Sequence, residues 1–277
     1  MNKEVLVVIG SGGIGLAIAR RLGSGKNVLL ADINQDTLET AVKALKADGH
    51  QVSAQQVDVS SHESVHSLAN AAANLGNILQ VVTTAGLSPV MAPPKAILAV
   101  DLLGVALVLE EFCHVIAPGG AGLVISSMAG YMPPPLPPEQ NEALAHTPAD
   151  ELLQLPFLGP DAVPNSGTAY GISKRANHLR VQAASIDWGE RGARINSISP
   201  GIILTPLAEQ EMSGPGGPGY RAMIEASPAR RVGTTDEIAS AAAYLLGPDA
   251  GFITGSDLLI DGGVIAAMRS GRLNLPL

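Results

Sequence analysis

The sequence predicts one α/β domain, built on a doubly wound parallel sheet of about seven strands with helices on both faces. Short apolar, β-branched runs alternate with longer amphipathic patterns along the whole chain, which is typical of parallel strands joined by helices. The chain of 277 residues is long enough for one large domain and short for two. With 46% hydrophobic residues, 31 glycines and only 15% charged residues, the composition favours close packing of helices against a sheet.

Seven runs are expected to form the strands. In order they read EVLVVI (residues 4–9), NVLLA (27–31), QVSAQQV (51–57), LQVVTT (79–84), GLVIS (122–126), RINSIS (194–199) and DLLI (257–260). Between them lie stretches with a helical pattern, at residues 14–22, 35–48, 64–75, 95–116, 169–188 and 235–246. No internal repeat of fixed period accompanies this alternation, so we expect a single domain over residues 1–277.

Two segments break the alternation of strands and helices. Residues 131–166 open with a proline-rich run and contain a short helical pattern at 149–155. An excursion this long is rarely a simple connector, and it predicts either a substrate lid or pocket wall, or an arm that contacts another subunit. Residues 204–227 contain the run SGPGGPG, which predicts a mobile loop beside the substrate.

Composition excludes several classes of function. The net charge of −8, without any run of basic residues, argues against nucleic acid or an anionic membrane as a partner. Cys113 is the only cysteine, so no internal disulfide can form, and the six histidines have no metal-ligand spacing. No apolar run is long enough to cross a membrane, and the glycine-rich N-terminus does not fit a signal peptide. We expect a cytoplasmic protein without a metal, assembled as a homo-oligomer (a dimer or a tetramer).

A glycine-rich turn follows the first strand and opens the first helix. It consists of Gly10, Ser11, Gly12, Gly13, Ile14 and Gly15. This pattern is the dinucleotide-binding fingerprint of a Rossmann-type fold, in which glycines allow a tight turn and let the backbone approach a pyrophosphate. The N–H groups of the helix N-terminus and its dipole would favour that anion.

Asp32 follows the second strand and bears on the choice of nucleotide. A carboxylate there accepts hydrogen bonds from the ribose hydroxyls and repels a 2′-phosphate, and its neighbour Ile33 offers no positive charge. The sequence therefore predicts NAD rather than NADP as cofactor. The alternative is that Asp32 merely caps the next helix.

Tyr170 and Lys174 lie four residues apart within a predicted helix, so their side chains share one face. An ammonium beside a phenol favours the ionised form, and we expect it to lower the pKa of Tyr170. This chemistry suits proton exchange with an alcohol oxygen. The pair alone is weak evidence for a catalytic site, since two exposed helical residues without a function can have the same spacing.

Together these motifs resemble the short-chain dehydrogenase/reductase (SDR) family nearly from end to end. The resemblance places the catalytic serine at Ser127, beside the Tyr-x-x-x-Lys pair, and implies that Ser127 orients the substrate oxygen. It implies further cofactor contacts at Asp58, Val59, Thr84, Ala85, Gly86, Pro200, Gly201, Ile203 and Thr205, in addition to Tyr170 and Lys174. Substrate contacts are expected from Ser127, Met128, Leu155, Phe157, Tyr170 and Leu207.

Three positions depart from the family pattern. The glycine loop is one residue short, with Ile9 in place of a threonine, so the hydrogen bonds to the pyrophosphate are expected to differ. Asp101 stands where the family has a helix asparagine on the proton path to the lysine, and it either tunes Lys174 or is simply a paired buried carboxylate. The segment 131–166 lengthens the spacing between Ser127 and Tyr170.

The resemblance implies an NAD-dependent oxidoreductase that interconverts a secondary alcohol and a ketone. The long segment 131–166 and family analogy suggest a fairly apolar substrate, such as a hydroxysteroid or an alicyclic alcohol. The alternative is an NAD-binding regulatory or scaffold protein with little turnover.

Overall fold

The protein folds around one seven-stranded parallel sheet, and its computed structural model describes residues 3–132 and 135–273. The strands stand in the order β3-β2-β1-β4-β5-β6-β7. They are β1 (Glu4–Ile9), β2 (Asn27–Asp32), β3 (Gln51–Gln56), β4 (Asn77–Thr83), β5 (Ile116–Ile125), β6 (Arg194–Pro200) and β7 (Asp257–Ile260). The order reverses between β1 and β4, so the loops after these two strands meet where such sheets bind nucleotides.

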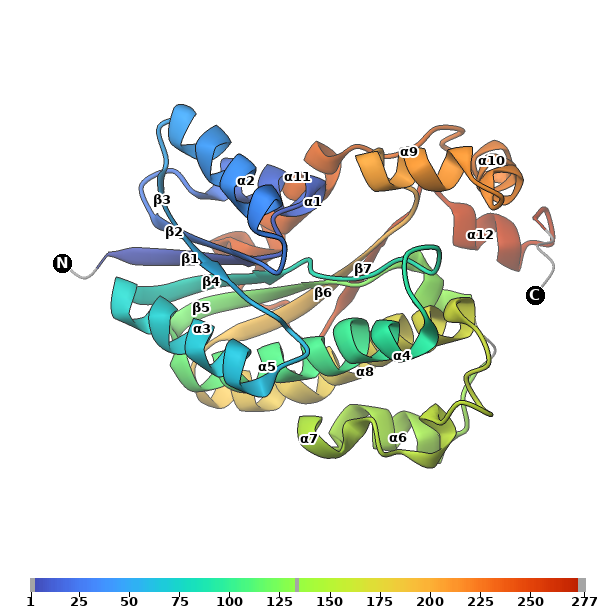
Figure 1. Cartoon of the computed structure of the whole chain (residues 1–277), viewed down its shortest axis with the longest axis horizontal. Coiled ribbons are helices and arrows are strands. Elements are labelled where there is room, and N and C mark those ends of the chain that lie inside the picture. The colour runs from blue at the N-terminus through green and yellow to red at the C-terminus, as the bar shows by residue number, and fades with distance from the viewer. Residues whose placement is uncertain (1–2, 133–134, 274–277) are drawn as a thin grey trace.

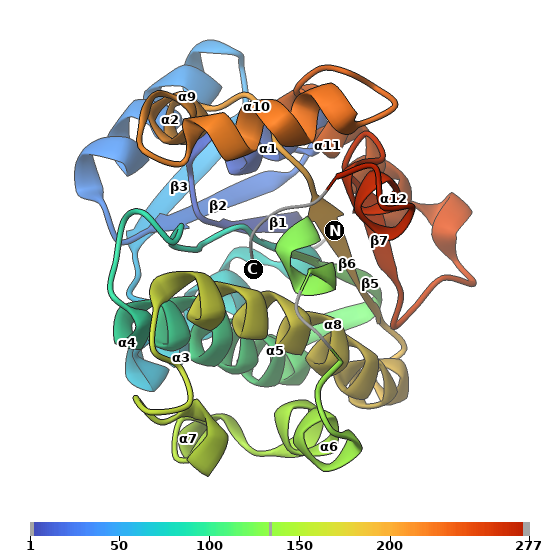
Figure 2. The same ribbon diagram turned by 90° about the vertical axis from the view of Figure 1, so that its right-hand side faces the viewer.

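Helices cover both faces of the sheet (Figure 1, Figure 2). One face carries α1 (Gly13–Leu22), α2 (Gln35–Ala47) and α11 (Thr235–Leu246). The other carries α3 (His62–Leu75), α4 (Pro94–Ile97), α5 (Gly104–Val115) and α8 (Ser166–Glu190). The carboxyl end of the sheet is flanked by α9 (Pro206–Ser213), α10 (Gly217–Ala226) and α12 (Val264–Arg269).

Alternating side chains of the central strands supply both halves of the core. Val5, Val7 and Ile9 pack with α3, α5 and α8, whereas Leu6 and Val8 pack with α1, α2 and α11. All five are fully buried. Strands covered on both faces need apolar residues at every position, which explains the unbroken apolar run of β1.

The predicted fold class is confirmed, and all seven strands are present. The fifth strand starts earlier than predicted, at Ile116, directly after α5. The single helix predicted at residues 95–116 is divided, because Leu98–Leu103 between α4 and α5 form a π-helical stretch that contains Asp101. Such stretches often occur at functional sites. None of the described helices is long and apolar enough to cross a membrane.

The segment 131–166 forms a partial further layer below α5 and α8, away from the sheet (Figure 1, Figure 2). It contains two short helices, α6 (Pro138–His146) and α7 (Ala149–Leu152). Leu144 and Leu152 are fully buried within the core cluster of α5 and α8. Arg180 of α8 donates to the carbonyls of Leu144 and Thr147 at 3.1 and 2.8 Å, and it pairs with Glu110 of α5 at 3.0 Å. Apolar burial and a buried guanidinium therefore hold this segment to the domain.

Candidate active site

The glycine loop after β1 has the shape needed to approach a pyrophosphate. Gly10 has a φ of +95°, which L side chains rarely adopt, and a Cβ on Gly15 would lie 1.9 Å from the carbonyl oxygen of Gly10. A Cβ on Gly12, in contrast, would point into open space. No side chain caps the N-terminus of α1 at Gly12, so its first N–H groups remain available to an anion. The loop fits the diphosphate of a dinucleotide.

Asp32 is tied to this loop and does not cap the following helix. Its Oδ2 accepts hydrogen bonds from the N–H and the hydroxyl of Ser11, at 2.7 and 2.9 Å, and its Oδ1 accepts from Asn34 N–H at 3.0 Å. The cap of α2 is Asn34, which accepts from Thr37 N–H. The neighbouring Ile33 is 61% exposed. Oδ1, which accepts only one hydrogen bond from the described residues, keeps a lone pair that a ribose hydroxyl can use.

Thr84, directly after β4, lies beside the glycine loop and contacts its first residue. Its hydroxyl donates to the Gly10 carbonyl at 2.9 Å. Gly86 lies two residues on, where a Cβ would lie 3.3 Å from Asp101 Oδ2 and 3.4 Å from Lys174 Nζ. The loop after β4 therefore contacts the glycine turn at one end, through Thr84, and lies beside Asp101 and Lys174 at the other, through Gly86.

Ser127, Tyr170 and Lys174 line one pocket of about 400 Å³ at the carboxyl ends of the strands. Ser127 follows β5, and the other two project from the first turns of α8, which Asn165 caps by accepting from Thr168 N–H at 2.9 Å. Lys174 Nζ lies 5.3 Å from the centre of the Tyr170 ring. The helical spacing thus brings the ammonium to the phenol, as predicted.

Lys174 is also paired with Asp101. Its Nζ lies 3.2 Å from Asp101 Oδ2, and both side chains are almost completely buried. The approach is off the line that a hydrogen bond requires, so Oδ2 has no hydrogen-bond donor, while Oδ1 accepts from Leu87 N–H at 2.7 Å. With its side-chain amide oriented to satisfy its hydrogen bonds, Asn177 of α8 donates to the backbone carbonyl of Asp101 at 3.0 Å. Asp101 is therefore a paired buried carboxylate that touches the lysine directly.

The pKa of Tyr170 is raised and not lowered. Burial is the largest cause, and the Lys174 charge and the Ser127 hydroxyl only partly offset it. Burial alone would lower the pKa of Lys174, but the Asp101 carboxylate outweighs burial and raises it. Burial raises the pKa of Asp101, and the Lys174 charge partly reverses that shift. The expectation of a lowered Tyr170 pKa fails because sequence spacing does not report burial.

The turn that carries Ser127 is anchored from the edge of the sheet. The turn Met128–Tyr131 follows Ser127, whose hydroxyl accepts from Ala129 N–H at 3.1 Å. The Tyr131 hydroxyl donates to Asp257 of β7 at 2.6 Å. The ring of Tyr131 also lies 4.9 Å from that of His178 on α8. Two elements far apart in the sequence thus fix this turn.

The rest of the pocket wall is largely apolar and comes mostly from the loops after the strands. Predicted residues that line it are Ile14, Thr84, Gly86, Asp101, Ser127, Met128, Tyr170, Lys174, Pro200, Gly201, Ile203 and Thr205. Leu155 and Phe157 do not line it, which corrects that prediction: both pack against the core. Of residues 131–166, Met132 lines the pocket. Leu207 belongs to α9, but its side chain lies outside the described part of the structure.

Two other predicted contacts lie beside β3. Asp58 Oδ1 accepts from the N–H and the hydroxyl of Ser60, at 2.9 and 2.7 Å. Val59 is buried against Gly104 of α5, where an added Cβ would lie 2.8 Å from Val59 Cγ2.

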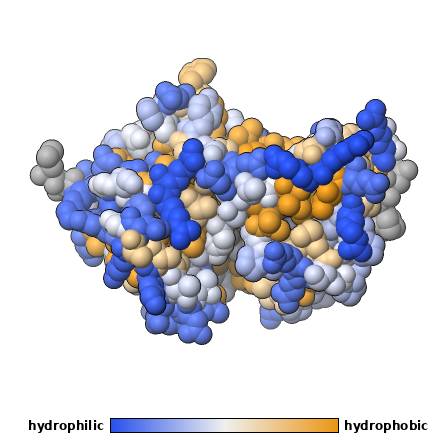
Figure 3. Space-filling model, turned by 90° about the horizontal axis from the view of Figure 1, so that it is seen from above, coloured by the Kyte–Doolittle hydropathy of each residue, from blue (hydrophilic) through white to orange (hydrophobic). Residues whose placement is uncertain are grey.

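Sequence reasoning missed part of the wall. Glu211, Tyr220 and Met223, from α9 and α10, also line the pocket. The glycine-rich composition of residues 204–227 indicated that this segment lies beside the substrate. Its polar side chains, such as Glu211 and Tyr220, are the sequence signal that could have identified these wall residues. Seen from above, hydrophobic surface gathers at the end of the molecule that carries α9 and α10 (Figure 3).

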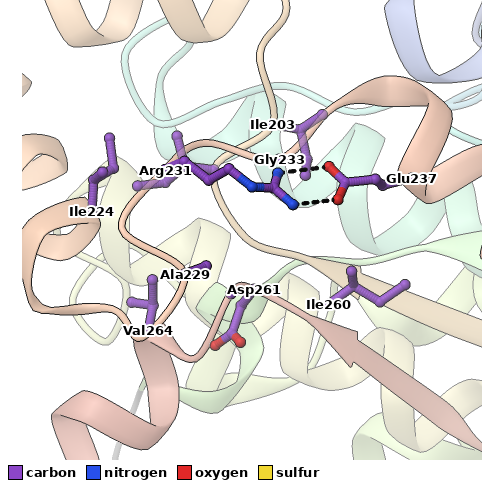
Figure 4. Close-up of a pocket in the computed structure, with 11 residues that line it drawn as sticks. Ile203, Ile224, Ala229, Arg231, Gly233, Glu237, Ile260, Asp261 and Val264 are labelled. Atoms are coloured by element: carbon purple, nitrogen blue, oxygen red, sulfur yellow. Dashed lines mark hydrogen bonds and ion pairs between the residues drawn. The ribbon is translucent and has the colours of Figure 1, made fainter.

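A second, smaller pocket of about 160 Å³ lies behind Ile202 and Ile203. Figure 4 shows the Arg231 guanidinium beside it, paired with Glu237 through two hydrogen bonds of 2.9 and 2.6 Å. None of Ser127, Tyr170 and Lys174 lines this pocket. Across the described residues, no group of three or more His, Cys, Asp and Glu side chains could hold a metal ion.

Comparison with known proteins decides the family. The chain is 45% identical over 267 residues to "Short-chain dehydrogenase/reductase bsc3" of Alternaria brassicicola, a match that covers 96% of this chain and 97% of the relative. The chain belongs to the short-chain dehydrogenase/reductase family. Residues 3–138 match the family model described as short chain dehydrogenase, and residues 149–265 match the one described as enoyl-(acyl carrier protein) reductase.

Other SDR proteins match over most of their length. The "3-alpha-hydroxysteroid dehydrogenase/carbonyl reductase" of Comamonas testosteroni is 30% identical over 243 residues, covering 82% of this chain and 91% of that protein. The solved structure of an SDR from Serratia marcescens superimposes with a TM-score of 0.72 at 26% identity, covering 95% and 98% of the two chains. As an SDR, this chain is an oxidoreductase that acts on an alcohol or its ketone with a nicotinamide cofactor, NAD or NADP.

Proposed function

We propose that this SDR uses NAD to interconvert a secondary alcohol and its ketone on an apolar, alicyclic or steroid-like skeleton. The observation that carries the proposal is the pocket shared by Ser127, Tyr170 and Lys174, which adjoins the glycine loop after β1. A phenol, a hydroxyl and a buried ammonium in one cavity suit proton exchange with an alcohol oxygen.

Each side chain has a distinct role in this proposal. Tyr170 donates a proton to the ketone oxygen during reduction, or takes it from the alcohol during oxidation. Ser127 holds that oxygen by a hydrogen bond, and Lys174 binds the cofactor ribose. The bound nicotinamide would supply or accept the hydride. Burial keeps the pKa of Tyr170 above its usual value, so the residue is a phenol at neutral pH in the protein without its cofactor.

Asp32 supports NAD as the cofactor. Its carboxylate is fixed by three hydrogen bonds, so a 2′-phosphate would meet a negative charge that cannot swing aside. Titration of the protein with NAD and with NADP should show the tighter binding for NAD. Equal or tighter binding of NADP would refute this part of the proposal.

The apolar wall supports an apolar substrate skeleton, and the Comamonas relative is named for a hydroxysteroid. We further propose that residues 131–166 act as a brace for α5 and α8 more than as a lid, since Leu144 and Leu152 of this segment are fully buried in the core cluster of those helices. A homo-oligomer remains part of the proposal. The large exposed apolar side chains of Tyr244 on α11, of Phe252 and of Leu258 on β7 are consistent with it.

The decisive experiment is an absorbance assay of NADH formation and consumption over secondary alcohols and ketones, with Tyr170→Phe as the variant. Removing the proton donor should lower kcat by at least about 10²-fold, while NAD affinity stays nearly unchanged. Normal turnover by Tyr170→Phe would refute the assigned role. NAD binding without turnover of any alcohol or ketone would favour a regulatory protein.

A further inference from the structure

A carboxylate and a phenol form a polar pair in the wall of the candidate site. Glu211 of α9 and Tyr220 of α10 both line the pocket that contains Ser127 and Tyr170. The Tyr220 hydroxyl donates to Glu211 Oε2 at 3.0 Å. Neither residue has a part in the proton chemistry proposed above, so the pair calls for a separate explanation.

The pair has unused capacity to accept a hydrogen bond. Within residues 3–132 and 135–273, Glu211 Oε1 accepts no hydrogen bond and Glu211 makes no ion pair. The wall of the pocket that it lines is partly apolar, with Met128, Met132 and Met223 among its residues. A carboxylate oxygen in such a wall gains most from a ligand that brings a hydrogen-bond donor.

The chemistry of the pair selects the kind of donor. An anionic group on the substrate would be repelled by Glu211. Tyr220 already donates one hydrogen bond to the carboxylate and partly satisfies it, so a neutral donor suffices for the remaining oxygen. A substrate hydroxyl meets this requirement and can lie against the apolar wall through its carbon skeleton.

We propose that Glu211, held by Tyr220, binds a second hydroxyl group of the substrate, away from the carbon that reacts. The inference rests on the proposed alcohol–ketone function and narrows it to cyclic hydroxyketones and the corresponding diols. Simple ketones and keto acids are then poor substrates. Glu211 is thus a specificity-determining residue, whereas Ser127 and Tyr170 handle the reacting oxygen.

A matched pair of ketones tests this assignment. 4-Hydroxycyclohexanone and 4-methylcyclohexanone differ by a hydroxyl and a methyl group of similar size. A hydrogen bond to a charged group should make wild-type kcat/KM about 10- to 100-fold higher for the hydroxyketone. In Glu211→Leu this preference should disappear, and in Tyr220→Phe it should weaken. Glu209→Leu is the control, because Glu209 is exposed on α9 and does not line the pocket.

A binding measurement separates this inference from the proposed function. Calorimetric titration of the NADH-loaded protein with cyclohexane-1,4-diol and with 4-methylcyclohexanol reports recognition without turnover, because the reduced cofactor cannot accept a hydride from either alcohol. Tighter binding of the diol to wild type but not to Glu211→Leu supports the inference, even if no ketone is reduced and the proposed reaction fails. The inference is overturned if Glu211→Leu keeps the preference of wild type for the diol, or if wild type binds neither alcohol. It is also overturned if wild type, titrated in the same way with the keto acid 4-oxocyclohexanecarboxylate, binds that anion more tightly than the diol.

Discussion

Replacing Asp101 by asparagine removes the charge that faces Lys174 and keeps the shape of the side chain. The two charged groups are 3.2 Å apart, and their side chains are 0% and 5% exposed. At that distance two unit charges attract by about 5 kcal/mol for an effective dielectric constant of about 20. The variant leaves the ammonium buried without a counter-ion. We therefore expect the free energy of unfolding at neutral pH to fall by about 3 kcal/mol.

Urea unfolding at neutral and at strongly alkaline pH measures this effect. The Asp101 carboxylate raises the pKa of Lys174 above its usual 10.5, against the effect of burial. A lysine whose pKa is raised by folding adds stability below its unfolded pKa and loses it as the pH rises through its folded pKa. The difference in the free energy of unfolding between wild type and Asp101→Asn should therefore be complete at neutral pH and become smaller above pH 10.5.

Asp48→Asn provides the control. Asp48 pairs with Arg20 at 2.8 Å, but the two side chains are 43% and 49% exposed, so its loss should cost less than about 1 kcal/mol. If Asp101→Asn unfolded at the same urea concentration as wild type at neutral pH, the buried ion pair would contribute nothing, and the reasoning would be wrong.

Two further predictions concern the segment 131–166. Leu152→Ala should lower the free energy of unfolding by about 2–5 kcal/mol, because Leu152 is fully buried. Leu153→Ala, the control at a 36% exposed position, should change it little. Equal losses of stability in urea unfolding of the two variants would contradict the packing of this segment. Hydrogen bonds to Glu111, and to a lesser degree to Asp150 of α7, raise the pKa of His62. The stability it adds is therefore complete below about pH 6.5 and is lost as the pH rises through its folded pKa. Urea unfolding of His62→Gln across this range should show a difference from wild type that declines with pH, and a constant difference would refute it.

Much of the fold and part of the site could be predicted because short-range patterns determine them. The apolar runs identified every strand, and the spacing of Tyr170 and Lys174 brought their side chains together. The glycine turn and Asp32 lie close together, since the turn follows β1, Asp32 ends the neighbouring parallel strand β2, and Ser11 donates hydrogen bonds to Asp32.

The remaining features depend on contacts between distant segments. The raised pKa of Tyr170 reflects burial that no local pattern encodes. Leu155 and Phe157 were predicted to contact substrate, but they pack against the core, because the sequence pattern of an apolar pocket wall is the same as that of a core. Glu211 lines the site because of the positions of α9 and α10, and composition predicted a mobile loop in place of these helices.

The packing of residues 131–166 on α5 and α8 has a consequence for the sequence of α5 itself. A helix at the surface of a three-layer sandwich needs a polar stripe, yet six consecutive residues from Gly104 to Leu109 are buried. The N-terminal half of α5 is thus buried on every side, whereas His114 near its end is exposed, and α7 of the segment packs against this helix. Replacing the segment alone by the shorter connection of a relative would therefore expose apolar surface of α5 and α8 to water.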